Sequence, residues 1–291
     1  MKYILFNEKS RNGGNQETFE HLKSKFENDE FHIKNIIGIN FKEFFTTLKI
    51  EDEVIICGGD GTLNHFANDI VGLRLPCRFY FYSAGTGNDF KNDMKEYIRD
   101  ELIYLNEVVR NLPVVTINDK EYRFIDGIGF GIDGYCCEKG DELQAKSDKP
   151  VNYSKIAING LLFDYKRPNA KITVDGVTKE YKKVWLAPTM LGKYYGGGMI
   201  IAPNQDRFNK EHTVSSVVMY GSGKLKTLMV FPKIFKGEHV AHKEMVEVRT
   251  GKNITVEFDR PTALQIDGET VRNVLKYSVR VEEEDIASKN R

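Results

Sequence analysis

Two segments of the sequence place glycines, a carboxylate, a hydroxyl and an amide directly after a short apolar run. Residues 54–57 are followed by a first loop, which consists of Gly58, Gly59, Asp60, Gly61 and Thr62 and leads to Asn64. Residues 78–82 are followed by a second loop, residues 83–90, which contains Thr86, Asn88 and Asp89. Glycines let another molecule approach the backbone closely, and a helix N-terminus favours phosphate groups. The two loops therefore predict a nucleotide phosphate site.

Each loop also has a purely structural interpretation. A tight turn from strand to helix needs glycine for its geometry, and Asp89 alone would make a suitable N-cap. The first loop, however, has more glycines than one turn needs, and a buried Asp60 is costly without a partner. In a doubly wound sheet, two such loops can flank one crevice. We therefore favour a shared phosphate site, in which Asp60 and Asp89 hold Mg²⁺ directly or through water.

A third acidic segment lies far downstream, where residues 265–269 read Gln-Ile-Asp-Gly-Glu. A hairpin turn explains the pair Asp267 and Gly268 by itself. The functional alternative is a general base that takes a proton from an attacking hydroxyl group. The spacing of the residues leaves both interpretations open.

Alternating strands and helices position the two glycine loops. Apolar runs predict strands at residues 2–7, 31–39, 54–57 and 78–82, and helical spacing predicts helices at residues 18–26, 41–48, 64–71 and 93–109. Asn40 is a suitable N-cap for the second of these helices. This order predicts a doubly wound, mostly parallel α/β domain over residues 1–113.

The pattern changes after residue 113 to short alternating segments separated by turns. Strands are expected at residues 123–126, 171–174, 183–187, 214–220, 245–250, 254–258 and 264–266, and helices at residues 154–164 and 224–235. Residues 114–272 are therefore expected to form an antiparallel β-sandwich. The lysines of residues 224–236 suggest either a surface for anionic lipid or a core-packed helix with solvated lysines. We favour the second interpretation.

The composition excludes several classes of protein. The 291 residues carry 42 basic and 42 acidic side chains, which argues against a dedicated nucleic-acid binder. The four cysteines lack metal-binding spacing, so a zinc site is not expected. No apolar stretch approaches the length of a membrane span. We expect a cytoplasmic protein with at most peripheral membrane contact, which could form a homodimer through an exposed edge strand.

The ordered set of motifs resembles the bacterial diacylglycerol kinase-like lipid kinases. The Gly-Gly-Asp-Gly-Thr of residues 58–62 is similar to a motif of diacylglycerol, sphingosine and NAD kinases and of phosphofructokinases. Residues 85–90 resemble the Gly-Thr-x-Asn-Asp-Phe of the lipid-kinase branch, and residues 267–269 its late Asp-Gly-Glu. Residues 196–199, followed by Ala202 and Pro203, resemble its Gly-Gly-Gly…Pro element.

The resemblance implies an ATP- and Mg²⁺-dependent kinase whose active site lies in the cleft between the two domains and whose substrate is a lipid hydroxyl, as in diacylglycerol. Glu269 would accept the proton, with Asp267 and Asp60 in the catalytic network. The nucleotide would be held by Asn7, Ser10, Gly13, Asn40, Gly58, Gly59, Asp60, Gly61, Thr62, Asn64, Thr86, Asn88 and Asp89. The enzyme would contact membranes peripherally, and a final strand within residues 273–285, at 277–281, would return to the N-terminal domain.

Three departures from the family pattern stand out. The first strand is followed by Asn7-Glu8-Lys9-Ser10-Arg11, which lacks the family's proline. Residues 38–40 replace an expected threonine, so that Asn40 stands near its position. Residues 204–210 replace a turn that binds a structural Mg²⁺, and they leave Asp206 as its candidate ligand. Two alternatives therefore stay open, namely an NAD kinase-like small-molecule kinase and a non-catalytic sensor of nucleotide or lipid.

Overall fold

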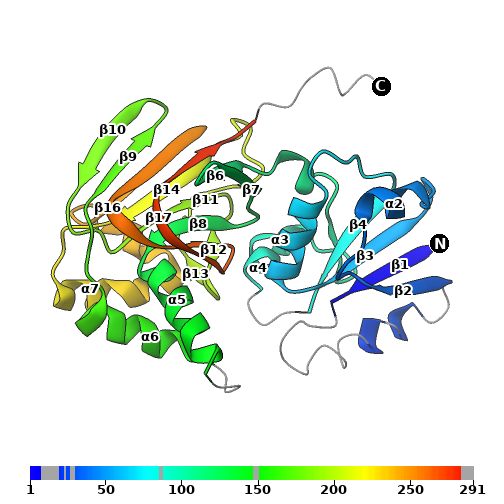
Figure 1. The fold of residues 1–291 in the computed structure, drawn as a ribbon, viewed down its shortest axis with the longest axis horizontal. Coiled ribbons are helices and arrows are strands. Elements are labelled where there is room, and N and C mark those ends of the chain that lie inside the picture. Colours follow the sequence, from blue (N-terminus) through cyan, green and yellow to red (C-terminus); the bar gives the residue numbers. More distant parts are fainter. Residues whose placement is uncertain (8–19, 23, 27–29, 85–87, 147–150, 283–291) are drawn as a thin grey trace. The chain divides into compact units, whose positions relative to one another are not determined.

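The computed structural model describes residues 1–7, 20–22, 24–26, 30–84, 88–146 and 151–282. The chain divides into two compact units, Met1–Leu112 and Pro113–Arg291 (Figure 1). Within the described residues, no helix is both long and apolar enough to cross a bilayer.

The first unit is built on a sheet of order β2-β1-β3-β4-β5. Four of its strands are parallel, and the short β5 runs antiparallel to β4. The strands are β1 (Lys2–Phe6), β2 (Phe31–Asn35), β3 (Glu53–Gly58), β4 (Arg78–Ser83) and β5 (Ile103–Tyr104). The parallel α/β domain expected from the sequence is therefore confirmed.

Both faces of this sheet are covered, because successive side chains of a strand point to opposite faces. On one face Ile55 packs in a cluster with Leu22 and Phe26. On the other face Phe66 stacks on Phe79 with ring centroids 5.8 Å apart. The helices are α2 (Phe41–Thr46), α3 (Asp60–Asp69) and α4 (Asp89–Asp93), with 3-10 turns at Lys95–Tyr97 and Val109–Asn111.

Two helix predictions for this unit need correction. The helix expected at residues 64–71 begins four residues earlier, at Asp60, because Gly59 adopts an extended N-cap conformation. The helix expected at residues 93–109 does not form. Asp100 and Glu101 both have positive φ, at 50° and 67°, so the chain turns there and adds β5 to the sheet edge.

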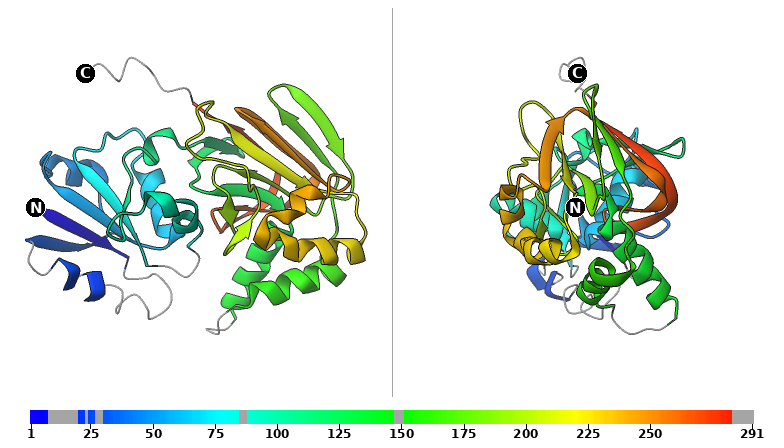
Figure 2. Two further views of the ribbon diagram at one scale, coloured as in Figure 1. Left: turned by 180° about the vertical axis from the view of Figure 1, so that it is seen from behind. Right: turned by 90° about the vertical axis from the view of Figure 1, so that its left-hand side faces the viewer.

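The second unit contains an antiparallel sheet of order β15-β14-β11-β8-β16-β17-β6-β7, with β9 and β10 attached beside β16 (Figure 2). Its strands are β6 (Val114–Ile117), β7 (Lys120–Arg123), β8 (Gly127–Gly131), β9 (Ala170–Val174), β10 (Val177–Tyr181), β11 (Leu186–Met190), β14 (Val214–Met219), β15 (Val246–Gly251), β16 (Asn253–Ile266) and β17 (Glu269–Arg280). A separate small hairpin pairs β12 (Tyr194–Tyr195) with β13 (Met199–Ile200).

The long strand β16 joins two strands that the sequence predicts separately, at residues 254–258 and 264–266. Its first half pairs with β9 and its second half with β8, and the register shifts between Glu257 and Leu264. Pro261 lies in this irregular stretch and has no N–H to donate to the ladder. The strand therefore bends there rather than ending.

Helices cover one side of this sheet in Figures 1 and 2. They are α5 (Ile132–Gln144), α6 (Tyr153–Asn159) and α7 (Lys224–Val230), with a π-helical turn at Gly160–Asp164 and 3-10 turns at Phe231–Lys236 and Glu238–Ala241. The sequence analysis missed α5, because its glycines interrupt the apolar stripe. Gly134 is required by packing, since a Cβ there would lie 2.3 Å from the Ala263 carbonyl oxygen of β16.

The last strand does not return to the first unit as expected. In β17, Tyr277 pairs with Val256 of β16 on one side and with Ile117 of β6 on the other. The Tyr277 ring is fully buried and its hydroxyl donates to the Ala187 carbonyl at 3.0 Å. These contacts all lie within the second unit, so residues 277–281 belong to it.

Candidate functional site

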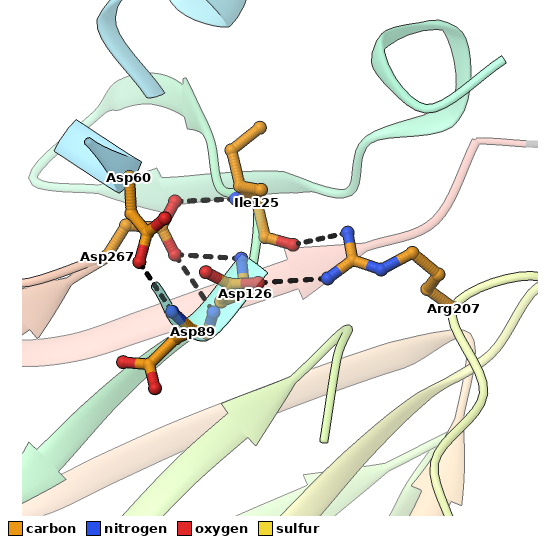
Figure 3. A network of polar contacts seen from close by, with 7 residues as sticks. Asp60, Asp89, Ile125, Asp126, Arg207 and Asp267 are labelled. Atoms are coloured by element: carbon orange, nitrogen blue, oxygen red, sulfur yellow. Dashed lines mark hydrogen bonds and ion pairs between the residues drawn. The ribbon is translucent and has the colours of Figure 1, made fainter. Parts of the chain in front are cut away.

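The carboxyl ends of neighbouring parallel strands bring the two glycine loops together in the first unit. The Asp89 backbone N–H donates to Asp60 Oδ2 at 2.8 Å (Figure 3). The Asn7 side chain, directly after β1, donates to the Thr62 hydroxyl at 2.9 Å. Residues that follow β1, β3 and β4 therefore meet at one edge of the sheet, where open α/β folds bind ligands.

In the first loop, β3 ends at Gly58 and α3 begins at Asp60, with only Gly59 between them. A Cβ at Gly58 would lie 2.6 Å from the Thr62 hydroxyl oxygen, so only glycine fits beneath Thr62. The helix α3 begins at Asp60, which leaves the N–H groups of its first turn without helical acceptors. This is the arrangement that binds phosphate at a helix N-terminus.

The second loop is fixed by its own polar contacts in its described part. Asn88 adopts the left-handed conformation, with φ of 52°, and caps α4. Its Oδ1 atom accepts a hydrogen bond from the Ser83 hydroxyl at 2.5 Å. Asp89 follows as the first residue of α4 and is buried. The buried Asn64 lies one turn into α3, where its carbonyl accepts from Asn68 at 3.0 Å.

Four predicted nucleotide-binding residues cannot be assigned to this edge of the sheet: three lie outside the described residues, and Asn40 lies elsewhere in the first unit. Ser10, Gly13 and Thr86 lie outside the described residues. Asn40 caps α2, with its Oδ1 3.3 Å from the Glu43 N–H. It also lines an open pocket of about 520 Å³ together with Asp69, which ends α3. Because Asp60 begins that helix, this pocket lies at the opposite end of α3 from the glycine loop.

In the second unit, the turn between β16 and β17 is held by the carboxylate of Asp267. This side chain accepts hydrogen bonds from the N–H groups of Ile125, at 2.5 Å, and of Asp126 and Gly127, both at 2.9 Å (Figure 3). Both carboxylate oxygens thus bind backbone. The bonds explain Asp267 as the residue that positions the turn, and its catalytic role stays a prediction.

Glu269 is the first residue of β17, immediately after this turn, and its side chain is exposed. The hairpin geometry that accounts for Asp267 and Gly268 gives no reason for a carboxylate at position 269. Burial raises the pKa of Cys137 of α5, and carboxylates that include Glu269 raise it further. The strand that Glu269 begins, β17, contacts α5.

The residues at Asp206 do not fit a structural metal ion. Asp206 is exposed, and its Oδ1 accepts from the Phe208 N–H at 3.0 Å. The next residue, Arg207, instead places a guanidinium against Asp126 at 2.9 Å and donates to the Ile125 carbonyl at 3.1 Å (Figure 3). Both side chains of this ion pair are only 4% exposed. A cation is therefore supplied here by the chain itself.

The first unit, by contrast, has donors that fit Mg²⁺ bound to phosphate. Asp60 and Asp89 offer carboxylates and Thr62 offers a hydroxyl at one sheet edge. Nowhere in the described part of the chain do three or more His, Cys, Asp or Glu side chains gather in a metal-binding group. Mg²⁺ commonly takes one or two carboxylates and completes its shell with waters and substrate phosphates. Asp60 and Asp89 match that pattern rather than a protein-only cage.

Sequence analysis overlooked a buried carboxyl group in the second unit, Asp133 of α5. Its two oxygens and the Nε2 atom of Gln265 on β16 are buried and make no hydrogen bond of ordinary geometry, although nearby donors, including the Gly134 N–H and Tyr195, partly oppose the effect of burial on the Asp133 pKa. Burial raises the pKa of Asp133 to about 6 and the pKa of the neighbouring Tyr195 well above its ordinary value. Carboxyl groups with raised pKa values are frequent at functional sites.

A local signal for Asp133 exists in the sequence. Residues 127–133 repeat the order of strand, glycines and carboxylate seen in the first glycine loop. Gly129 is required there, since a Cβ would lie 2.7 Å from Asp133 Oδ2. Only the tertiary structure, however, shows that Gln265 pairs beside Gly129 and thus faces Asp133.

Comparisons with known proteins agree with both units. Residues 2–113 match the diacylglycerol kinase catalytic domain, and residues 127–283 match the YegS C-terminal NAD kinase beta sandwich-like domain. The chain belongs to the bacterial diacylglycerol kinase-like family. The resemblance seen in the motifs is thereby confirmed, as is the division into an α/β unit and an antiparallel β unit.

Members of the family are similar to this chain in sequence and in fold. A diacylglycerol kinase of Mycobacterium tuberculosis is 25% identical over 217 residues, which cover 72% of this chain and 67% of that protein. A crystal structure of a diacylglycerol kinase from Bacillus anthracis covers 96% of this chain and 93% of its own, with a TM-score of 0.59 and 18% identity. The latter similarity concerns the fold alone.

Proposed function

We propose that this member of the diacylglycerol kinase-like family is a lipid kinase that transfers the γ-phosphate of ATP, with Mg²⁺, to the hydroxyl group of diacylglycerol or a similar lipid. The observation that carries the proposal is the hydrogen bond from the Asp89 N–H to Asp60. It couples the two glycine loops. One sheet edge can therefore offer a helix N-terminus to a polyphosphate and two carboxylates to the Mg²⁺ bound with it. Family membership and the diacylglycerol kinase named among its relatives support the lipid as acceptor.

The proposed roles follow from charge and position. The N–H groups at the start of α3 and the Thr62 hydroxyl bind phosphate oxygens, and Asp60 and Asp89 hold the metal. Mg²⁺, when bound, neutralises charge on the phosphates. The exposed Glu269 carboxylate takes the proton of the lipid hydroxyl as that oxygen attacks phosphorus. Asp267 keeps Glu269 in place through its bonds to the backbone of residues 125–127.

The proposal is tested with two variants whose geometry is conserved. Asp60→Asn retains an oxygen that can accept from the Asp89 N–H, so the loops stay coupled while the charge is lost. We expect turnover of a short-chain diacylglycerol to fall by about 10²-fold or more, because Mg²⁺ loses a carboxylate. Glu269→Gln should lower turnover by about 10²-fold with ATP affinity nearly unchanged, because it removes only the base.

Matched controls lie on the same elements. Asp69→Asn changes an exposed carboxylate at the other end of α3, and Glu257→Gln changes an exposed one on β16. Both controls should keep full turnover. Labelled ATP with a panel of diacylglycerol, other lipid alcohols and NAD⁺ identifies the acceptor. Phosphorylation of NAD⁺ but of no lipid would replace the proposal with a small-molecule kinase, and ATP binding without any transfer would indicate a sensor.

A further inference from the structure

Three of the four most exposed large apolar side chains in the described part of the chain lie on two adjoining helical segments of the second unit. Leu225 and Met229 of α7 are 78% and 69% exposed, and Phe163 of the π-helical turn after α6 is 73% exposed. Isolated apolar residues on a surface are ordinary, but a cluster of protruding ones marks an interaction site. We call these three residues the α6–α7 apolar surface.

The segments that carry these three exposed side chains lie next to each other. Lys224 Nζ donates to the Leu162 carbonyl at 2.6 Å, which joins the residues directly preceding Leu225 and Phe163. Figures 1 and 2 both show α6 and α7 next to each other along one edge of the second unit. Leu225 and Met229 stand four residues apart and so share one face of α7.

The opposite face of α7 already has its packing partners. Val230 is buried in the core cluster that contains Trp185, and the buried Thr227 hydroxyl lies 2.7 Å from the Ser222 hydroxyl. The helix is therefore docked on the unit through one face and displays leucine and methionine on the other. A helix that served only to cover the core would carry polar residues on its outer face. The core-packing interpretation of this segment is therefore confirmed for one face of α7, and the lipid-facing interpretation stays a prediction for the other.

The two segments that carry the surface are basic although the whole chain is neutral. Residues 153–164 and 224–236 together contain five lysines, one aspartate and no glutamate. One of these lysines, Lys226, pairs with Glu244 at 2.8 Å, while Lys155 of α6 and Lys236 of the 3-10 turn after α7 are exposed. Long lysine side chains beside protruding apolar residues suit the boundary between lipid headgroups and acyl chains.

We propose that the α6–α7 apolar surface docks on an anionic bilayer, inserting Phe163, Leu225 and Met229 among the acyl chains while the lysines bind acidic headgroups. The proposal names the membrane contact of the kinase proposed above, whose substrate resides in that bilayer. A protein partner is a poorer match, because a stable protein interface involves about 20–30 residues a side, far more than three protruding side chains. A bilayer needs only a few insertions supported by charge.

The test measures binding to vesicles without ATP, so it is independent of catalysis. Co-sedimentation is compared for vesicles of phosphatidylcholine alone and with about one-third phosphatidylglycerol. The double variant Leu225→Ser/Met229→Ser should reduce the partition coefficient on anionic vesicles by about tenfold or more, and Phe163→Ser by about tenfold. Lys155→Gln/Lys236→Gln should weaken binding severalfold on anionic vesicles only, because each lysine adds attraction to acidic headgroups.

Two controls change exposed apolar residues elsewhere. Val177→Ser alters a 60% exposed side chain on β10, and Ile50→Ser a 79% exposed one in the first unit. Both should bind vesicles as the unchanged protein does. The proposal is overturned if the controls lose binding as much as the surface variants, or if the surface variants keep it. It is also overturned if those variants instead abolish a concentration-dependent dimer in analytical ultracentrifugation.

The outcome for the surface is separable from the outcome for the kinase. Turnover of a dispersed short-chain diacylglycerol should be unchanged in Leu225→Ser/Met229→Ser, whereas phosphorylation of long-chain diacylglycerol in vesicles should fall with binding. If no lipid is phosphorylated but vesicle binding still depends on these residues, the membrane-docking proposal is supported and the proposed kinase function is contradicted. If the variant and the unchanged protein phosphorylate lipid in vesicles equally, only the membrane-docking proposal is contradicted.

Discussion

At the scale of single residues, the buried carboxyl group of Asp133 is expected to make the stability of the protein depend on pH. It is buried at the start of α5, and its oxygens make no hydrogen bond of ordinary geometry. Because burial raises its pKa from 3.8 to about 6, the folded state binds a proton that the unfolded state has released between these values. Stability is therefore lost as pH rises from about 4 to 6, and the cost above pH 6 is on the order of 3 kcal/mol.

The substitution Asp133→Asn should therefore stabilise the protein at neutral pH. We expect the free energy of unfolding at pH 7.5 to rise by up to about 3 kcal/mol, with the gain disappearing near pH 4, where the carboxyl group is protonated in both states. Urea denaturation at several pH values measures this. Asp141→Asn, on an exposed part of the same helix, should change stability by less than about 0.5 kcal/mol. A stability loss at pH 7.5 would show that the ionised Asp133 is satisfied in the fold.

At the scale of elements, a buried ion pair links three segments that approach the β16–β17 turn. Arg207 binds Asp126 and the Ile125 carbonyl, and Asp267 accepts from the N–H groups of the same two residues. The loop containing Arg207, the segment before β8 and the hairpin turn are thereby joined. A change at Arg207 is expected to reach Glu269 through these contacts.

Arg207→Met should destabilise the protein by about 3–5 kcal/mol, because it leaves the Asp126 carboxylate buried without its cation. Urea denaturation measures the loss. The double variant Arg207→Met/Asp126→Leu should regain much of the stability, since it removes both charges. Arg260→Met, which breaks an exposed pair with Asp259 4.0 Å away, should cost less than about 1 kcal/mol. A loss below 1 kcal/mol for Arg207→Met would exclude a structural role for this pair.

At the scale of the whole molecule, the metal is expected to serve the reaction rather than the fold. Removing divalent cations with EDTA should abolish lipid phosphorylation, because ATP is proposed to bind with Mg²⁺ through Asp60 and Asp89. The same treatment should shift the thermal unfolding midpoint by less than about 2 °C, since a site that takes its ligands from phosphate and water contributes little to the nucleotide-free fold. Differential scanning calorimetry with and without EDTA measures this. A large downward shift would reveal a structural metal ion that the residues around Asp206 do not suggest.

Local sequence determined the parts of this protein whose conformation depends on near neighbours. The run of residues 54–57 with the glycines after it specified a buried strand and a tight turn into a helix, and Asp267-Gly268 specified a hairpin. Gly58 is explained by Thr62, only four residues away. Such short-range geometry leaves clear residue patterns, and the ordered motifs then indicated the family.

Tertiary structure decided whatever depends on residues far apart in the chain. It showed that Asp60 binds the Asp89 backbone, that the carboxylate of Asp267 holds residues 125–127, and that β17 stays in the second unit. It also identified α5, whose glycines fit against β16, and the buried Asp133 on it. Burial and pairing across more than a hundred residues follow from packing in three dimensions, which has no local period for the sequence to display.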